Sequence, residues 1–134
     1  MLKPLLLALL LAALPVVGHA DDRADFASHV ETCVAEFGTT DALVGACVEE
    51  QVAARENYLG DILIETEGAL DAKHGLAFNA AQAAWELYRD KTCAYQAALE
   101  PRDAMPRGLL CRLRLVNARI SDVLENAAFA AFED

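Results

Sequence analysis

Positive charge, glycine and proline are all scarce in this chain of 134 residues. It carries 11 Lys and Arg against 21 Asp and Glu, which gives a formal net charge of −10 at pH 7. Binding to nucleic acid depends on Lys and Arg side chains that neutralise phosphates, and an acidic surface is repelled by anionic lipids. The composition therefore argues against nucleic-acid and anionic-lipid partners and favours cationic ones.

Signs of β-structure are also missing. Apolar and polar residues nowhere alternate over a stretch long enough to predict a strand, and no internal repeat or low-complexity tract is present. Apolar residues recur instead at the spacing of an α-helix. The sequence therefore predicts an all-α fold, a small antiparallel bundle of about four helices.

The residue sets that mark metal sites and common enzyme centres are absent as well. The chain has no Cys-x-x-Cys pair, and His29 and His74 stand at no spacing typical of metal ligands. No Ser-His-Asp spacing is recognisable, and neighbouring carboxylates such as Glu65 and Glu67 diverge around a helix. We expect no metal, no cofactor and no enzymatic activity.

The first 20 residues have the features of a secretory signal peptide. Lys3 supplies the positive charge, residues 5–13 form an apolar run, and Gly18-His19-Ala20 is a small-x-small cleavage site. The run is too short to span a bilayer. We expect a single helical domain over residues 21–134, with a net charge of −11 once Lys3 is lost and no stable membrane insertion. These features predict a periplasmic or secreted protein.

Four cysteines follow the predicted cleavage site: Cys33, Cys47, Cys93 and Cys111. An even number in an oxidising compartment predicts two disulfides. Three pairings are possible, and the sequential one, Cys33–Cys47 and Cys93–Cys111, is favoured because each pair flanks one turn between helices. In the chain-entropy model a closed loop of this size contributes roughly 3 kcal/mol.

An apolar stripe at helical spacing predicts a first helix over residues 21–37. The stripe comprises Phe26, Val30, Cys33 and Phe37. Gly38 is placed to end this helix, and Thr40 or Asp41 to cap the next one.

A second helical segment is expected over residues 42–70, with Leu43 and Cys47 on its inner face and a row of valines beside them. Gly60 and Gly68 each weaken a helix by roughly 1 kcal/mol relative to Ala. The segment is therefore expected as one long helix or as two.

Residues 71–75 are expected to be a connection, followed by a helix from Leu76 or Asn79 to Leu99. Pro101 and Pro106 bracket the next connection, residues 100–107. A last helix begins between residues 106 and 110, and its apolar stripe comprises Leu109, Leu113, Val116, Ile120, Val123 and Ala127. Three basic residues are expected to point away from that stripe: Arg112, Arg114 and Arg119.

The stretch Asn79–Cys93 is predicted to be the central helix, around which the others pack. Asn79 can cap its start, and Gln82, Trp85 and Arg89 share one face. Trp85, the only tryptophan, is expected to be a core anchor, with Gln82 as a partner for its indole N–H or for a loop carbonyl. Arg89 and Asp90 are expected to form a bridge that fixes the helix register.

The same stretch resembles the lysozyme inhibitor LprI-like family. Ala81-Gln82, Trp85, Tyr88-Arg89-Asp90 and Cys93 match the family's A-Q-x-x-W-x-x-[YF]-R-D-x-x-C run. The spacing of Cys33 and Cys47 looks like its first cysteine pair. Cys111, Arg119 and Leu124 look like its C-terminal C…R…L segment, whereas Leu59-Gly60 stands where the family usually has Leu-Asn. The resemblance implies a disulfide-bonded helical domain of the envelope or the extracellular space, with motif residues Gln82, Trp85, Tyr88, Arg89 and Asp90 in structural roles.

The named activity of that family is inhibition of lysozyme. A strongly acidic protein would be steered towards a basic lysozyme, so we predict a protein-binding module that occludes the cleft of such an enzyme. Residues 38–45 and 100–108 are the candidate contact segments. The alternative is an envelope structural or interaction protein that does not bind lysozyme.

Overall fold

The computed structural model describes residues 20–38, 41–99 and 106–130, which contain four helices and no strand within those ranges. The helices are α1 (Ala20–Phe37), α2 (Asp41–Ala69), α3 (Ala72–Ala98) and α4 (Arg107–Ala130). The predicted all-α fold is therefore confirmed. The predicted signal peptide, residues 1–20, lies outside the described residues apart from Ala20, which begins α1, and so does the candidate cap Thr40.

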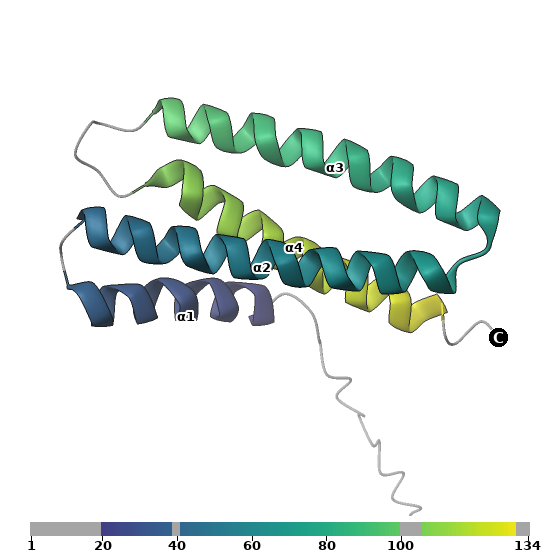
Figure 1. The fold of residues 1–134 in the computed structure, drawn as a ribbon, viewed down its shortest axis with the longest axis horizontal. Helices are drawn as coiled ribbons and strands as arrows, with labels where there is room; N and C mark the ends of the chain where they lie inside the picture. Colours follow the sequence, from purple (N-terminus) through teal and green to yellow (C-terminus); the bar gives the residue numbers. More distant parts are fainter. Residues whose placement is uncertain (1–19, 39–40, 100–105, 131–134) are drawn as a thin grey trace, which may run out of the picture.

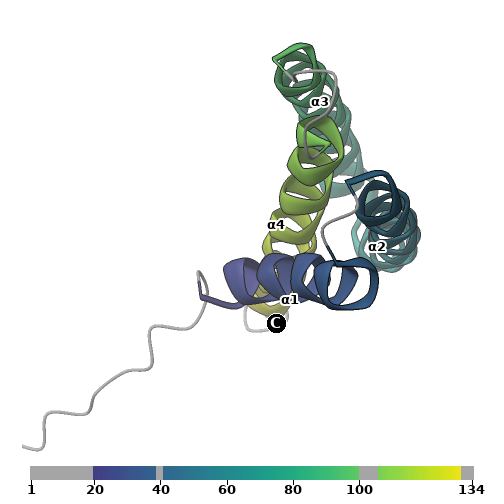
Figure 2. The same ribbon diagram turned by 90° about the vertical axis from the view of Figure 1, so that its left-hand side faces the viewer.

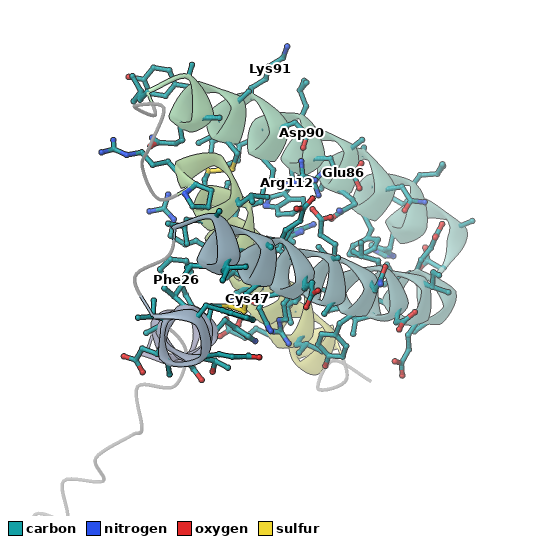
Figure 3. All side chains as sticks on the ribbon, turned by 60° about the vertical axis from the view of Figure 1, so that its left-hand side comes forward. Phe26, Cys47, Glu86, Asp90, Lys91 and Arg112 are labelled. Carbon is teal, nitrogen blue, oxygen red and sulfur yellow. A yellow bond between two sulfur atoms is a disulfide. The ribbon has the colours of Figure 1, made fainter. Side chains whose placement is uncertain are left out.

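Helices α2, α3 and α4 run roughly along one another, and α1 is inclined to them. The C-terminal ends of α1 and α3 and the beginnings of α2 and α4 lie at one end of the molecule, which we call the disulfide end, and the α2–α3 turn lies at the other (Figure 1). Seen along the bundle, α4 and α2 separate α1 from α3, which occupies an outer edge (Figure 2). In Figure 3, α1 is seen nearly end-on while α2 and α3 are seen obliquely, so the axis of α1 is inclined to theirs.

The end of α1 follows the sequence prediction. Gly38 has a φ of +66°, and its N–H donates to the Val34 carbonyl over 2.8 Å. A left-handed residue at this position closes the last turn of a helix, and glycine adopts that conformation without a steric penalty. The predicted apolar stripe of α1 packs against the core at the disulfide end through Phe26, Val30 and Phe37.

Helix α2 is one continuous helix, which decides between the two alternatives for residues 42–70. Neither Gly60 nor Gly68 interrupts it. Its buried residues are Val44, Cys47, Val48, Val52, Leu59 and Ile62. Leu43, expected on the inner face, is half exposed instead, because the face that contacts α4 is centred on the valines.

Helix α3 begins earlier than the sequence suggested. Asp71 is its N-cap and accepts a hydrogen bond from the His74 backbone N–H over 2.9 Å. This bond lowers the pKa of the Asp71 carboxyl, and the His74 side chain adds to the effect. The prediction that residues 71–75 are a connection and that Asn79 caps the helix is wrong. Asn79 lies inside α3 and donates to Glu67 over 2.5 Å.

The helix at the centre of the fold is α4 and not α3, so the prediction of a central helix at Asn79–Cys93 is also wrong. Helix α4 contributes to two apolar clusters, one at the disulfide end and one near the α2–α3 turn. Its buried apolar residues are Cys111, Leu113, Val116, Ile120 and Val123, as the stripe predicted, whereas Ala127 is exposed. Helix α3 buries only Gln82 and Cys93, because most of its surface faces solvent.

One polar pair lies in the interior beside these clusters. Asn117 of α4 is 1% exposed, and its Oδ1 accepts a hydrogen bond from Arg55 Nε of α2 over 2.7 Å. The Asn117 amide nitrogen has no partner among the described residues. A buried amide tolerates few alternative neighbours, so this pair favours one register of α2 against α4.

Candidate functional site

The family-like motif of α3 divides between its inner and outer faces. Gln82 is 8% exposed, and Trp85 is half-buried against the apolar cluster near the α2–α3 turn. The Arg89 side chain is 14% exposed, whereas Tyr88 is 57% exposed. Gln82, Trp85 and Arg89 therefore share the inner face as predicted, and Tyr88 points to solvent.

Gln82 makes one hydrogen bond within α3 and one that connects α3 to α4. It donates to Glu86 over 3.1 Å and accepts from Arg119 Nε over 3.0 Å. The sequence suggested that Gln82 would pair with the Trp85 indole N–H or with a loop carbonyl. Its partners are instead the side chains of Glu86 and Arg119. The Arg119 side chain is only 12% exposed and is also paired with Asp122. The sequence placed Arg119 off the apolar stripe of α4, and the structure directs its side chain to α3 instead of leaving it in solvent.

Two guanidinium groups lie close to the Trp85 ring. Arg89 is 5.2 Å from the ring centroid and Arg119 is 5.8 Å from it. Cations at this distance from a ring centroid are attracted by the negative face of the indole, by about 0.5–1 kcal/mol at exposed sites. The indole thus joins α3 to α4 by packing and by charge. It reaches α2 through the apolar cluster that Leu59 and Ile62 share.

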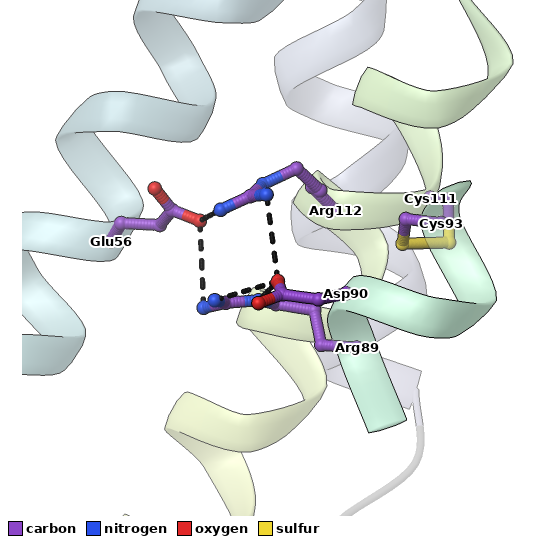
Figure 4. The surroundings of a disulfide bond; sticks show 6 residues. All are labelled: Glu56, Arg89, Asp90, Cys93, Cys111 and Arg112. Carbon is purple, nitrogen blue, oxygen red and sulfur yellow. Dashed lines mark hydrogen bonds and ion pairs between the residues drawn. A yellow bond between two sulfur atoms is a disulfide. The ribbon is translucent and has the colours of Figure 1, made fainter. Parts of the chain in front are cut away.

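Four alternating charges close a ring between α2, α3 and α4 (Figure 4). Arg112 donates to Glu56 over 2.7 Å, and Arg89 approaches the same Glu56 oxygen at 3.6 Å. Asp90 accepts from Arg89 over 2.9 Å and lies 3.6 Å from Arg112. The Arg89–Asp90 bridge is present as predicted, but it is half of a larger network that also includes Glu56 and Arg112.

The ring sets the protonation behaviour of Asp90. The hydrogen bond from Arg89, together with the charges of Arg89 and Arg112, lowers the pKa of the Asp90 carboxyl below its ordinary value, although burial acts in the opposite direction. The carboxylate form is therefore favoured by the folded arrangement. The carboxylate is 52% exposed, so each ion pair is screened by solvent and contributes modestly.

Two disulfides tie the helices together at the same end of the bundle. Cys33–Cys47 links α1 to α2 with a Cα–Cα distance of 5.6 Å, and Cys93–Cys111 links α3 to α4 with one of 5.4 Å. Both predicted pairings are confirmed. The second disulfide lies beside the charge ring, since Asp90 and Arg112 are its near neighbours along α3 and α4 (Figure 4).

The disulfide end also carries an open pocket of about 410 Å³ between α3 and α4. Its lining includes Cys93, Ala97, Pro106 and Arg112. A Cβ atom placed on Gly45 of α2 would lie 3.5 Å from Pro106 Cγ, so α2 closes against the start of α4 here. The described parts of the two candidate contact segments, residues 38–45 and 100–108, therefore meet at one end. Their residues 39–40 and 100–105 lie outside the described residues.

Across residues 20–38, 41–99 and 106–130, no group of three or more His, Cys, Asp and Glu side chains is placed to hold a metal ion. In the same ranges, no helix is long and apolar enough to cross a membrane. What the described residues do offer is a rigid helical frame with exposed carboxylates.

Comparison with known protein families identifies the family of this chain. The family model described as lysozyme inhibitor LprI matches residues 33–123, from the first disulfide cysteine to the last buried valine of α4. The chain belongs to the LprI lysozyme-inhibitor family. No curated protein and no solved structure matches it.

The LprI match covers both disulfides and the whole charge ring. Sequence reasoning missed Glu56 and the inward orientation of Arg112 and Arg119. Glu56 and Arg112 are 56 residues apart and meet only when α2 and α4 pack, so no local pattern marks them. Arg119 did carry a signal, since it belongs to the family-like C-terminal segment.

Proposed function

We propose that this protein is a secreted or periplasmic inhibitor that binds a basic lysozyme and occludes its catalytic cleft. Membership of the LprI family is the observation that carries the proposal. The charge supports it, because a chain with a net charge of −10 attracts a basic enzyme over long range and accelerates encounter. Occlusion needs no catalytic residue on the inhibitor, so the proposed protein is not an enzyme.

The exposed side of α2 is the best candidate for the first contact with a cationic partner. It carries the exposed carboxylates Glu49, Glu50, Asp61, Glu65 and Glu67. The only basic residue of α2, Arg55, is held inward by Asn117 and lies 5.2 Å from the Tyr58 ring centroid. The side of α2 is therefore strongly negative over its length, and it leads to the disulfide end.

The disulfide end supplies rigidity at the place where the candidate segments meet. Two cross-links and the Gly45–Pro106 contact hold the ends of all four helices together. A segment that is already ordered loses little conformational entropy when it binds. We propose that the disulfide end enters or covers the rim of the cleft, guided by the carboxylates of α2.

The inner motif residues have a different proposed role. Gln82, Trp85 and Arg89 are engaged with Glu86, Arg119 and Glu56 of the same chain, and they keep α3 in register with α2 and α4. Their contribution to binding would be indirect, through the shape of the frame.

A cell-wall lysis assay tests the function. The oxidised protein is titrated against a basic lysozyme, and complete inhibition near an equimolar ratio is expected. The double variant Glu50→Gln/Asp61→Asn is expected to inhibit more weakly, because two carboxylates leave the side of α2. The control, Glu31→Gln/Glu125→Gln, makes the same change of net charge on α1 and α4 and is expected to inhibit nearly as well as the unmodified protein.

Two outcomes would count against the proposal. Absence of inhibition at a several-fold molar excess would favour the alternative, an envelope interaction protein that ignores lysozyme. Equal weakening by both double variants would show that only total charge matters and that the side of α2 is not the contact.

A further inference from the structure

The outer side of α3 differs from the rest of this acidic molecule. Five large apolar side chains are exposed there: Leu76, Leu87, Tyr88, Tyr95 and Leu99. Leu76 is 75% exposed and Leu87 is 60% exposed. The positions recur with helical spacing along the helix, and exposed Ala80, Ala83, Ala84 and Ala98 fill the gaps between them. We call this set, together with Lys91, the outer α3 face.

No part of the described chain covers the outer α3 face. Helix α3 contacts α4 and, less extensively, α2, and it lies at the edge of the bundle away from α1 (Figure 2). With roughly 200 Å² for each fully exposed side chain of this size, the five large residues expose on the order of 600 Å². The largest apolar patch on a typical monomer is about 300–600 Å² and is often an interaction site, and the outer α3 face is at the upper end of that range.

The charged residues of α3 indicate which kind of partner fits the outer α3 face. Helix α3 has only two acidic residues, Glu86 and Asp90, and although both are exposed, each is paired within the helix, with Gln82 and with Arg89. The outer α3 face therefore carries no carboxylate, and the charged residues on that side of the helix are basic, namely Lys91 and Lys73. A basic lysozyme would be drawn to the carboxylates of α2 and not to this face. An anionic membrane would repel a chain with a net charge of −10.

A second copy of the chain fits these conditions. Two molecules with a net charge of −10 repel each other, and the repulsion is smallest where neither presents a carboxylate. We infer that the outer α3 face is the interface of a symmetric homodimer in which two α3 helices pack antiparallel. This inference is independent of the proposed inhibition of lysozyme.

The dimensions of α3 agree with such a dimer. Its 27 residues extend about 40 Å at about 1.5 Å per residue. The alanines allow two helices to approach closely, and burial of roughly 600 Å² on each copy would give about 1,200 Å² in total, the lower end of the range for specific interfaces.

The register follows from the positions of the leucines. A two-fold axis at Leu87, near the middle of α3, places Leu76 of one copy beside Ala98 of the other. The same axis separates the two copies of Lys91 by about 12 Å along the helices. Their repulsion is weak at that separation, because the Debye length at physiological salt is about 8 Å.

Sedimentation velocity over a series of concentrations tests this inference with the oxidised protein. The unmodified protein is expected to form a dimer. Leu87→Glu is expected to weaken the dimer by about 100-fold or more, because a central apolar side chain is lost from both copies and two carboxylates oppose each other. The variant should remain folded, with an unchanged helical circular dichroism spectrum, since Leu87 is 60% exposed within the monomer.

Ile64→Glu is the matched control. Ile64 is 73% exposed on α2, so the substitution removes a similar side chain and adds the same charge away from the interface. The control is expected to remain dimeric. A monomeric unmodified protein at the highest concentration overturns the inference, and so does equal dimerisation of Leu87→Glu. Binding of monomers to anionic vesicles through Leu87 would overturn it as well, since the face would then serve a membrane.

Discussion

Replacement of Trp85 by Ala tests how the three long helices are held together. Trp85 is half-buried, packs against the apolar cluster near the α2–α3 turn, and has the guanidinium groups of Arg89 and Arg119 near its ring. A fully buried Trp replaced by Ala costs about 3–5 kcal/mol, so half of that contribution with the lost guanidinium contacts gives about 2–3 kcal/mol. For a domain of this size, that loss lowers the melting temperature by roughly 10 °C.

The exposed neighbour in the same motif supplies the control. Tyr88→Ala removes an aromatic side chain of comparable size from a position that is mostly in solvent in the monomer, and at protein concentrations too low for the inferred dimer the expected cost is below about 0.5 kcal/mol. Trp85→Phe retains a ring against the cluster and is expected to fall between the two alanine variants.

Unfolding of the oxidised variants in urea, followed by far-ultraviolet circular dichroism, measures these differences, since loss of the only Trp removes the fluorescence signal. A Trp85→Ala variant within about 0.5 kcal/mol of the unmodified protein would refute the assignment of Trp85 as the link between α3 and the core. A Tyr88→Ala variant as destabilised as Trp85→Ala would refute it equally.

Three further perturbations have defined outcomes. A Cβ on Gly108 would lie 2.8 Å from the Ala97 Cβ, so Gly108→Ala should destabilise the protein. A Cβ on Gly60 would have no neighbour within 4 Å, so Gly60→Ala should stabilise the helix by up to about 1 kcal/mol. Thermal melts of the two variants and the unmodified protein measure both effects. The folded-state pKa of Asp90 lies below the unfolded value of about 3.9, so its carboxylate stabilises the fold above that pH, and this contribution is lost as the pH falls through the lowered pKa. Urea unfolding of Asp90→Asn across that pH range should lack this component, and an unchanged pH dependence would contradict the charge ring. Reduction of both disulfides should cost roughly 3 kcal/mol each in urea unfolding, and equal stability of the reduced protein would contradict their role.

Features with a local cause could be predicted from the sequence. Gly38 ends α1 because a left-handed C′ residue is needed one position after the helix, and a glycine stood there. The cysteine pairing follows from chain connectivity, since each pair flanks a single turn between antiparallel helices. The apolar stripe of α4 was readable because it keeps the helical period through Val123.

The start of α3 was mistaken because two residues compete as caps. Asp71 and Asn79 both have suitable side chains, and Gly75 lies between them in a stretch with few apolar residues. The hydrogen bond from the His74 N–H to Asp71 and the bond from Asn79 to Glu67 decide in favour of the earlier start. Such contacts depend on where the end of α2 lies, which propensity alone does not encode.

The centre of the fold was mistaken for a related reason. The motif of α3 is conspicuous because it contains Trp85 and ends in Cys93, but most other positions of that helix are exposed. Helix α4 contributes to both apolar clusters although its residues are individually unremarkable. The charge ring was invisible to local patterns, because Glu56 and Arg112 become neighbours only through tertiary packing.

Calorimetric titration of a purified basic lysozyme with the oxidised protein, at low and at high salt, measures the proposed recognition directly. We predict saturable binding with one lysozyme per chain and an affinity that falls as the salt concentration rises, because opposite net charges drive the encounter. Heats that never saturate, at either salt concentration, would contradict the assignment of this LprI-family protein as a lysozyme-binding inhibitor.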